Sequence, residues 1–190
     1  MDDDATTYGR RSGSRERATQ PKLSAKDRAL GLLAVRWRSR RELQDRLRRA
    51  GYESEDIDRA LTDLEASGLV DDERFARETV LHQSRRRMAG DRAIRTALRQ
   101  KGVSPEVTER MLAEADAGPG GTAQERASAL AEARAPRLAA LESEAAFRRL
   151  FGLLVRRGHA PGIARDAARR ALSEVMSPSA LDDGGPLGED

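Results

Sequence analysis

One amphipathic pattern occurs three times along the chain. Segments of ten residues run from Arg41 to Ala50, from Arg92 to Lys101 and from Arg148 to Arg157, and each carries aliphatic side chains four positions apart. Because residues four apart lie on the same face of a helix, each segment is predicted to be a helix with one apolar and one basic face. Three copies at intervals of 51 and 56 residues indicate an internal repeat.

A glycine follows each copy at the same offset, at Gly51, Gly102 and Gly158. Glycine lacks a Cβ, so it readily adopts the left-handed conformation that commonly ends a helix. A short turn and another helical pattern follow each glycine, which predicts a further helix after each stop. The side chains expected to be buried after the first two stops are Ile57, Leu61, Leu64, Val107, Met111 and Leu112.

Two helix starts carry a reciprocal capping pattern. Ser39 with Glu42 and Thr122 with Glu125 match the capping box, in which the hydroxyl accepts an amide hydrogen bond and the glutamate reaches back. Further starts are predicted from hydroxyl, carboxylate and Ser-Pro signals at Ser24, Ser54, Asp71 and Ser104. The helix after Ser24 is expected to bury Leu30, Leu33 and Val35.

These elements predict an all-α protein, an elongated curved array of three tandem three-helix repeats. Period-two apolar runs are lacking, so no strand is expected. Stacked neighbours are expected to share one continuous core, and Pro136 is expected to kink or end its helix. The expected division is a disordered leader over 1–24, repeats over 25–70, 71–116 and 122–176, a flexible linker over 117–121 and a disordered tail over 177–190.

Composition narrows the class further. Hydrophobic residues make up 38% of the chain, charged residues 35% and aromatic residues 3%, which favours thin helical layers over a large globular core. The absence of cysteine excludes disulfides and thiol chemistry and is compatible with the cytoplasm, where we expect the protein to act. The N-terminal segment has no apolar core typical of a signal peptide, and no apolar run reaches the ~18 residues of a membrane span.

Positive charge is concentrated in the repeated helices. The chain carries a net charge of +3, yet residues 34–49, 85–101 and 148–170 carry +5, +6 and +6, which leaves −14 for the remainder. A basic stripe along one face of an elongated body is typical of a protein that binds a phosphate backbone. The residues predicted to bind nucleic acid or its filament are Arg40, Arg41, Arg48, Arg49, Arg85, Arg86, Arg87, Arg92, Arg95, Arg99, Lys101, Arg148, Arg149, Arg156 and Arg157. We call this set the basic stripe.

Charge alone leaves other interpretations open. The arginines could form a solvated face paired with nearby acids, although few acids lie within these helices, or they could bind an acidic protein groove. Trp37 and Tyr52 lie near the first basic helix only, so sequence-specific base stacking is not supported.

Residues suited to catalysis are scarce. His82 and His159 are isolated, without metal-ligand spacing, and no phosphate-binding glycine loop is present. The carboxylates of Asp71, Asp72 and Glu73 are explained by the positive end of a helix dipole. We therefore predict no enzyme activity, no cofactor and no metal site.

Five segments resemble the RecX family of bacterial recombinase regulators. They read SRRELQDRLRRAGY, GLVDDERFARETV, RRRMAGDRAIRTALRQKGV, FRRLFGLLVRRGH and IARDAARRAL. The most specific are Leu69 to Phe75 and Arg99 to Val103, and the resemblance covers about residues 25–175. It implies a curved array of three-helix repeats that binds in the groove of the RecA filament on single-stranded DNA. It also implies a non-enzymatic regulator that lowers recombinase ATP hydrolysis, strand exchange and co-protease activity.

Two other functions fit the same residues. The helix pairs could serve an independent DNA- or RNA-binding protein, or the array could be a helical scaffold without a nucleic-acid role. The preferred hypothesis is a monomeric regulator whose partners are the RecA filament and, nonspecifically, single-stranded DNA.

Overall fold

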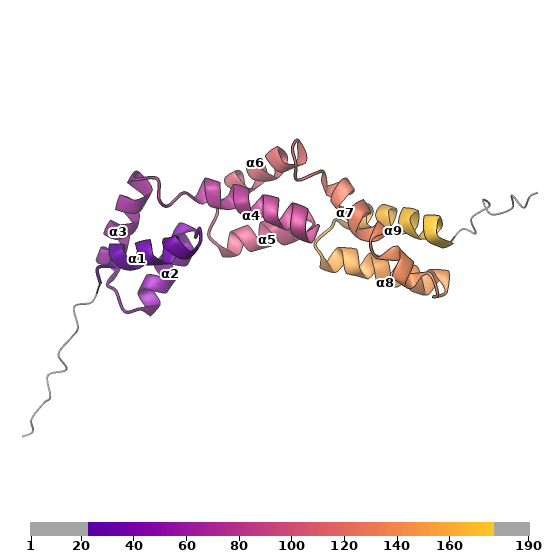
Figure 1. The fold of residues 1–190 in the computed structure, drawn as a ribbon, viewed down its shortest axis with the longest axis horizontal. Coiled ribbons are helices and arrows are strands. Elements are labelled where there is room, and N and C mark those ends of the chain that lie inside the picture. The colour runs from indigo at the N-terminus through magenta and orange to yellow at the C-terminus, as the bar shows by residue number, and fades with distance from the viewer. Residues whose placement is uncertain (1–22, 177–190) are drawn as a thin grey trace, which may run out of the picture.

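The computed structural model describes residues 23–176, which form an elongated, gently bent array of helices (Figure 1). The described range contains no strand, so the predicted all-α class is confirmed, whereas the predicted disorder of 1–22 and 177–190 concerns residues outside it. The elements in order are α1 (Ala25–Val35), α2 (Arg40–Arg49), α3 (Ser54–Ala66), α4 (Asp72–Arg87), α5 (Asp91–Gln100), α6 (Pro105–Asp116), α7 (Ala123–Glu132), the 3-10 helix η1 (Ala135–Leu138), α8 (Ser143–Arg156) and α9 (Pro161–Met176).

The helices form three triplets, each with its own core. The most extensive helix contacts join α1 to α3, α4 to α6 and α9 to both α7 and α8, all within a triplet. The buried apolar side chains accordingly form three clusters instead of the single continuous core expected from the sequence. That expectation was wrong because the triplets meet at their ends through hydrogen bonds and ion pairs, with Met88 packing against the third core.

The first core shows how far the apolar pattern was informative. Ile57, Leu61 and Leu64 of α3 are buried as predicted, and they pack with α2. The expected face of α1 was wrong in part: Leu33 is half-buried and packs against this core, whereas Leu30 is 37% exposed and Val35 is 78% exposed. Ala25 and Ala29 are the buried residues of α1. Their small side chains let α1 pack closely against its neighbours.

Most predicted helix starts are confirmed. Ser24, Ser39, Asp71 and Ser104 each accept a hydrogen bond from a first-turn amide. Residues Thr122 and Glu125 form the complete capping box.

Two details of the predicted caps were wrong. Ser54 is the first residue of α3, the N-cap is Glu53, and neither side chain caps the helix. Ser39 accepts the amide of Glu42, but the Glu42 carboxylate turns to basic side chains instead of reaching back. Charged donors bind a carboxylate more strongly than a neutral backbone amide does, so the nearby basic side chains take the place of the Ser39 amide.

The third repeat begins after a turn and contains a helix break at Pro136. Residues 117–120 form a turn after α6, and Gly121 accepts a hydrogen bond from the guanidinium of Arg126. Helix α7 ends at Glu132, and Pro136 lies in the first turn of η1. Proline cannot donate a backbone hydrogen bond, so the predicted break at this position is confirmed.

Candidate nucleic-acid interface

The three basic helices follow one another along one side of the molecule, in the order α2, α5, α8 (Figure 1). Gly51, Gly102 and Gly158 end them at φ values of 85°, 80° and 90°, which confirms the predicted left-handed stops. The turn after α5 contacts the start of α2, and the turn after α8 contacts the start of α5. We call these contacts the first joint and the second joint.

The second joint is made mainly by backbone. The amides of Gly90 and Arg92 donate to the carbonyls of Arg157 and Gly158 at 3.0 and 3.1 Å. First-turn amides of a helix have no partner within their own helix. Here the end of α8 supplies that partner, so negative carbonyl ends meet the positive end of α5.

Side chains complete the second joint. His159 is 1% exposed, and its Nε2 lies 3.0 Å from the carbonyl oxygen of Met88. Because a carbonyl only accepts, the neutral ring donates from Nε2. Burial lowers the pKa of His159, and it outweighs the opposing effect of that hydrogen bond. The guanidinium of Arg126, which is also buried, binds Asp91 at the start of α5 and Asp116 at the end of α6.

The first joint uses side chains instead. The hydroxyl of Ser39 donates to the carbonyl of Lys101 at 2.7 Å, and the Lys101 ammonium donates to Glu42 at 3.2 Å. The amide of Arg40 donates to the carboxylate of Asp72 at 2.8 Å. Burial raises the pKa of Asp72, against the effect of the Arg40 hydrogen bond.

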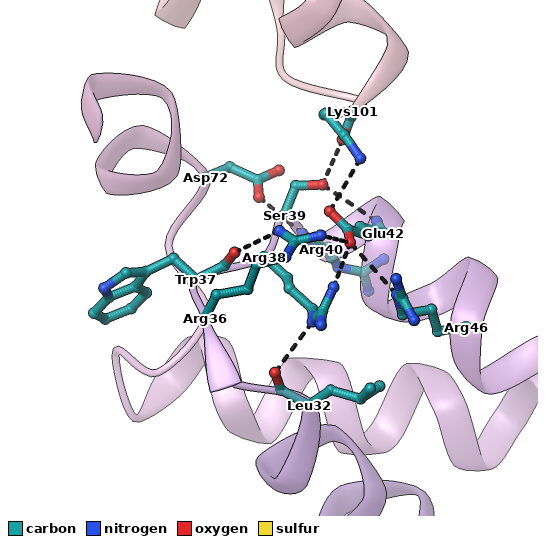
Figure 2. Close-up of polar contacts among 10 residues, drawn as sticks. All are labelled: Leu32, Arg36, Trp37, Arg38, Ser39, Arg40, Glu42, Arg46, Asp72 and Lys101. Carbon is teal, nitrogen blue, oxygen red and sulfur yellow. Dashed lines mark hydrogen bonds and ion pairs between the residues drawn. The ribbon is translucent and has the colours of Figure 1, made fainter. Parts of the chain in front are cut away.

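Glu42 lies at the centre of the first joint (Figure 2). Its carboxylate is 8% exposed and binds the side chains of Arg36, Arg38, Arg46 and Lys101. Burial alone would raise its pKa, but hydrogen bonds from Lys101, Arg38 and Arg36 outweigh burial and lower the pKa to about 2. The carboxylate is therefore ionised at neutral pH and joins two triplets.

Tertiary ion pairs neutralise part of the basic stripe. Arg95 forms a bidentate pair with Glu109 of α6 at 2.7 and 2.9 Å, and Arg40 binds Glu65 of α3 at 2.9 Å. The hydrogen bond with Glu109 raises the pKa of Arg95 further. Lys101, Arg48 and Arg148 also have carboxylate partners, at 3.2, 3.6 and 3.7 Å. The interpretation as a paired, solvated face is correct for these residues.

The other members of the basic stripe form no ion pair with residues 23–176. All but Arg157 are exposed, and Arg157 donates instead to the carbonyl of Arg87 at 3.0 Å. These members are Arg41, Arg49, Arg85, Arg86, Arg87, Arg92, Arg99, Arg149, Arg156 and Arg157. They lie mainly on α5, the end of α4 and α8, so uncompensated charge is greatest in the second and third triplets.

Two arginines beside this surface were missed by the sequence analysis. Arg134 and Arg137 flank Pro136 and line a hollow of about 630 Å³ together with residues of α8. Their spacing matches no basic-helix pattern, because Arg134 is the N-cap of η1 and Arg137 lies in its single turn. Arginines on both sides of a helix-breaking proline are the local signal that could have drawn attention to them.

The aromatic residues near the first basic helix have structural partners. The guanidinium carbon of Arg74 lies 4.1 Å from the ring centroid of Trp37, which is 37% exposed. The hydroxyl of Tyr52 donates to the carbonyl of Leu23 at 2.7 Å. None of the helices between residues 23 and 176 has the length and apolar character of a membrane-spanning segment.

Comparison with known proteins identifies relatives over most of the chain. Residues 25–64 match the family model for the first three-helix domain of RecX, and residues 71–112 match that for the second. The regulatory protein RecX of Corynebacterium efficiens is 38% identical over 83% of this chain and 76% of its own length. The regulatory protein RecX of Mycobacterium avium is 39% identical over 82% of this chain and 90% of its own.

Solved structures agree on the fold. The crystal structure of RecX from Lactobacillus salivarius superposes with a TM-score of 0.66 at 21% identity, covering 77% of this chain and 94% of that one. A second crystal structure of a regulatory protein RecX has a TM-score of 0.67 at 20% identity, covering 76% and 71%.

Proposed function

The chain belongs to the RecX family of regulatory proteins, and on that premise we propose that it regulates the RecA recombinase. In this proposal it binds in the groove of the RecA filament on single-stranded DNA and lowers ATP hydrolysis, strand exchange and co-protease activity. It thereby modulates homologous recombination and DNA repair, as part of the SOS response. It acts in the cytoplasm as a monomer, without catalysing a reaction itself.

The head-to-tail order of α2, α5 and α8 supports this proposal most directly. The two joints hold the three basic helices on one side of an elongated body, which suits contact along a filament rather than at one point. Exposed arginines such as Arg92 and Arg99 can bind phosphate oxygens of DNA or carboxylates of the filament. A body that spans neighbouring subunits would let few molecules affect many active sites.

The decisive experiment measures ATP hydrolysis by the cognate recombinase on single-stranded DNA. We expect strong inhibition when this protein is present well below one molecule per recombinase subunit. A folded protein that leaves hydrolysis unchanged at that ratio contradicts the proposal. If that protein still binds free DNA tightly and with sequence preference, it is an independent nucleic-acid-binding protein.

A charge-reversal pair tests the basic stripe itself. Arg92→Glu with Arg99→Glu changes two exposed arginines of α5 that have no ion-pair partner within residues 23–176. We expect inhibition to fall at least about tenfold, because attraction to phosphate or carboxylate becomes repulsion. The matched control, Arg28→Glu with Arg59→Glu on α1 and α3, makes the same change of net charge elsewhere. Equal losses in both variants would mean that only net charge matters.

A further inference from the structure

A hollow in the third triplet gathers more arginine than any sequence pattern indicated. It lies between η1 and α8, has a volume of about 630 Å³, and is lined by Arg134, Arg137, Arg148, Arg149 and Arg156. We call it the arginine groove. Leu138, Leu150 and Leu153 contribute apolar surface to the same hollow. Its residues lie outside both family-model matches, which end at residue 112.

The groove continues into a second hollow. Arg134 also lines the neighbouring hollow of about 370 Å³, together with Arg86, Arg87 and Arg157. Arginines from the end of α4, from η1 and from α8 thus share one surface. Among the residues lining these two hollows there is no carboxylate, and the ion pair found at the rim joins Arg148 to Glu144 at 3.7 Å.

This lining differs from the rest of the basic stripe. Arg40, Arg95 and Lys101 are held by carboxylates of other helices at 3.2 Å or less. Uncompensated guanidinium groups crowded around a hollow repel one another, and a bound polyanion relieves that repulsion. The arrangement therefore favours a ligand with several phosphates.

We propose that the arginine groove binds the sugar–phosphate backbone of single-stranded nucleic acid, so that Arg134 and Arg137 join α8 in the DNA contact of the protein. The proposal rests on the proposed function, whose DNA-binding surface it locates. A strand fits better than a single nucleotide because arginines continue through both hollows, beyond the few that one nucleotide could engage. The half-buried leucines of the lining, Leu138 and Leu153, offer apolar surface to sugars and bases without selecting a sequence.

The test is the binding of a fluorescent oligothymidylate of twenty nucleotides, measured by anisotropy over a range of salt concentrations. Arg134→Gln with Arg137→Gln removes two groove arginines that lie outside the basic stripe. We expect Kd to rise about tenfold, and the slope of log K against log salt to become shallower by about 1.4, at roughly 0.7 for each lost phosphate contact.

A matched control separates the groove from the general field of the protein. Arg165→Gln with Arg170→Gln removes two exposed arginines of α9 from the same triplet, neither of which lines either hollow. We expect Kd within twofold of the original chain. If both variants lose affinity equally, or if the Arg134 and Arg137 variant binds normally, the proposal is overturned.

Two further measurements address a variant that fails to fold and a site that binds a single nucleotide. If the Arg134 and Arg137 variant loses its helical circular dichroism, Arg148→Gln with Arg149→Gln on α8 takes its place with the same expected result. Competition by inorganic triphosphate or ATP at micromolar concentration would identify a nucleotide site and overturn the strand proposal.

Recombinase ATP hydrolysis is then measured separately with the original chain. Oligothymidylate binding that depends on the groove, without any effect on hydrolysis, refutes the proposed function and leaves the groove proposal standing. Inhibition by the original chain, together with unchanged oligothymidylate binding by the Arg134 and Arg137 variant, refutes the groove proposal and leaves the proposed function standing.

Discussion

The two joints make equivalent contacts between helices with different chemical groups. Each connects the end of one basic helix to the start of another, and each places a left-handed glycine there. The second joint satisfies α5 with backbone carbonyls of Arg157 and Gly158, around a buried histidine. The first joint relies on one carboxylate, Glu42, shared by four cations.

Because the two joints use different groups, the stability of each should be sensitive to a different kind of change. Backbone contact tolerates no added atoms, so the second joint should be sensitive to shape. Three cations of the first joint, Arg36, Arg46 and Lys101, are 43–47% exposed, so the first joint should be sensitive to pH and salt. In a repeat protein each interface adds its own term to stability, and both sensitivities should be measurable.

The largest expected effect comes from alanine at Gly158. A Cβ there would lie 2.5 Å from the backbone nitrogen of Ala93, and the residue has a φ of 90°. The left-handed conformation alone costs a non-glycine residue roughly 1–2 kcal/mol. Adding the backbone clash, we expect Gly158→Ala to lower the free energy of unfolding by more than about 3 kcal/mol. Urea unfolding followed by circular dichroism measures it.

Three other glycines separate strain from clash. Gly68→Ala meets open space at a φ of 69°, so we expect roughly 1 kcal/mol from strain alone. Gly102→Ala meets the side chain of Arg41 at 2.7 Å, which can partly move away, so we expect an intermediate loss. Gly90→Ala, at an ordinary negative φ, has backbone atoms of Gly158 and His159 as its nearest contacts, so its loss of stability reports the clash without the strain. A Gly158 variant no worse than the Gly68 variant would refute a tightly packed second joint.

The next effect concerns acid and Glu42. Its pKa is lowered in the folded protein, so its stabilising effect is complete above the usual pKa of about 4.5 and is lost as the pH falls toward 2. The shift corresponds to roughly 3 kcal/mol, which solvent screening of the exposed cations reduces to about 2. We expect Glu42→Gln to remove that part of the stability at pH 7 and at low salt.

Comparison across pH isolates the contribution of Glu42. Unfolding in urea at pH 7 and at pH 3 should differ less for Glu42→Gln than for the original chain, while Glu174→Gln on α9 should behave like the original. Equal pH dependence in all three proteins would contradict a stabilising carboxylate in the first joint.

The smallest effect is expected at mildly acidic pH, from His159. Burial lowers the pKa of His159 in the folded protein. Below about pH 6.5, therefore, the unfolded chain binds a proton at this residue more readily than the folded protein does. Stability should therefore decline as the pH falls from 7.5 to 5.5. His159→Gln should abolish that part of the decline, and His82→Gln, at an exposed site, should not. If the His82 variant carried the effect, the buried ring would not be its source.

Local features were predictable from the sequence because their causes are local. Leu43 and Leu47 share a helix face through their spacing of four, and both are fully buried. Thr122 caps α7 through an amide three residues away. At α1 the prediction was right for Leu33 and wrong for Leu30 and Val35, because four aliphatic residues offered several possible faces and packing against α2 and α3 buried Ala25 and Ala29.

By itself, the sequence determined the helices, their stops, their threefold repetition and the resemblance to RecX, since periodicity, capping and left-handed glycine act over a few residues. Only the tertiary structure decided which arginines are neutralised and which remain available. Glu42 reaches Lys101 across 59 positions, and Arg126 reaches Asp91 across 35. It also brought Arg134 and Arg137 beside α8. Charges interact through space. The sequence therefore gives the number of basic side chains, and only the fold shows which of them are paired with a carboxylate.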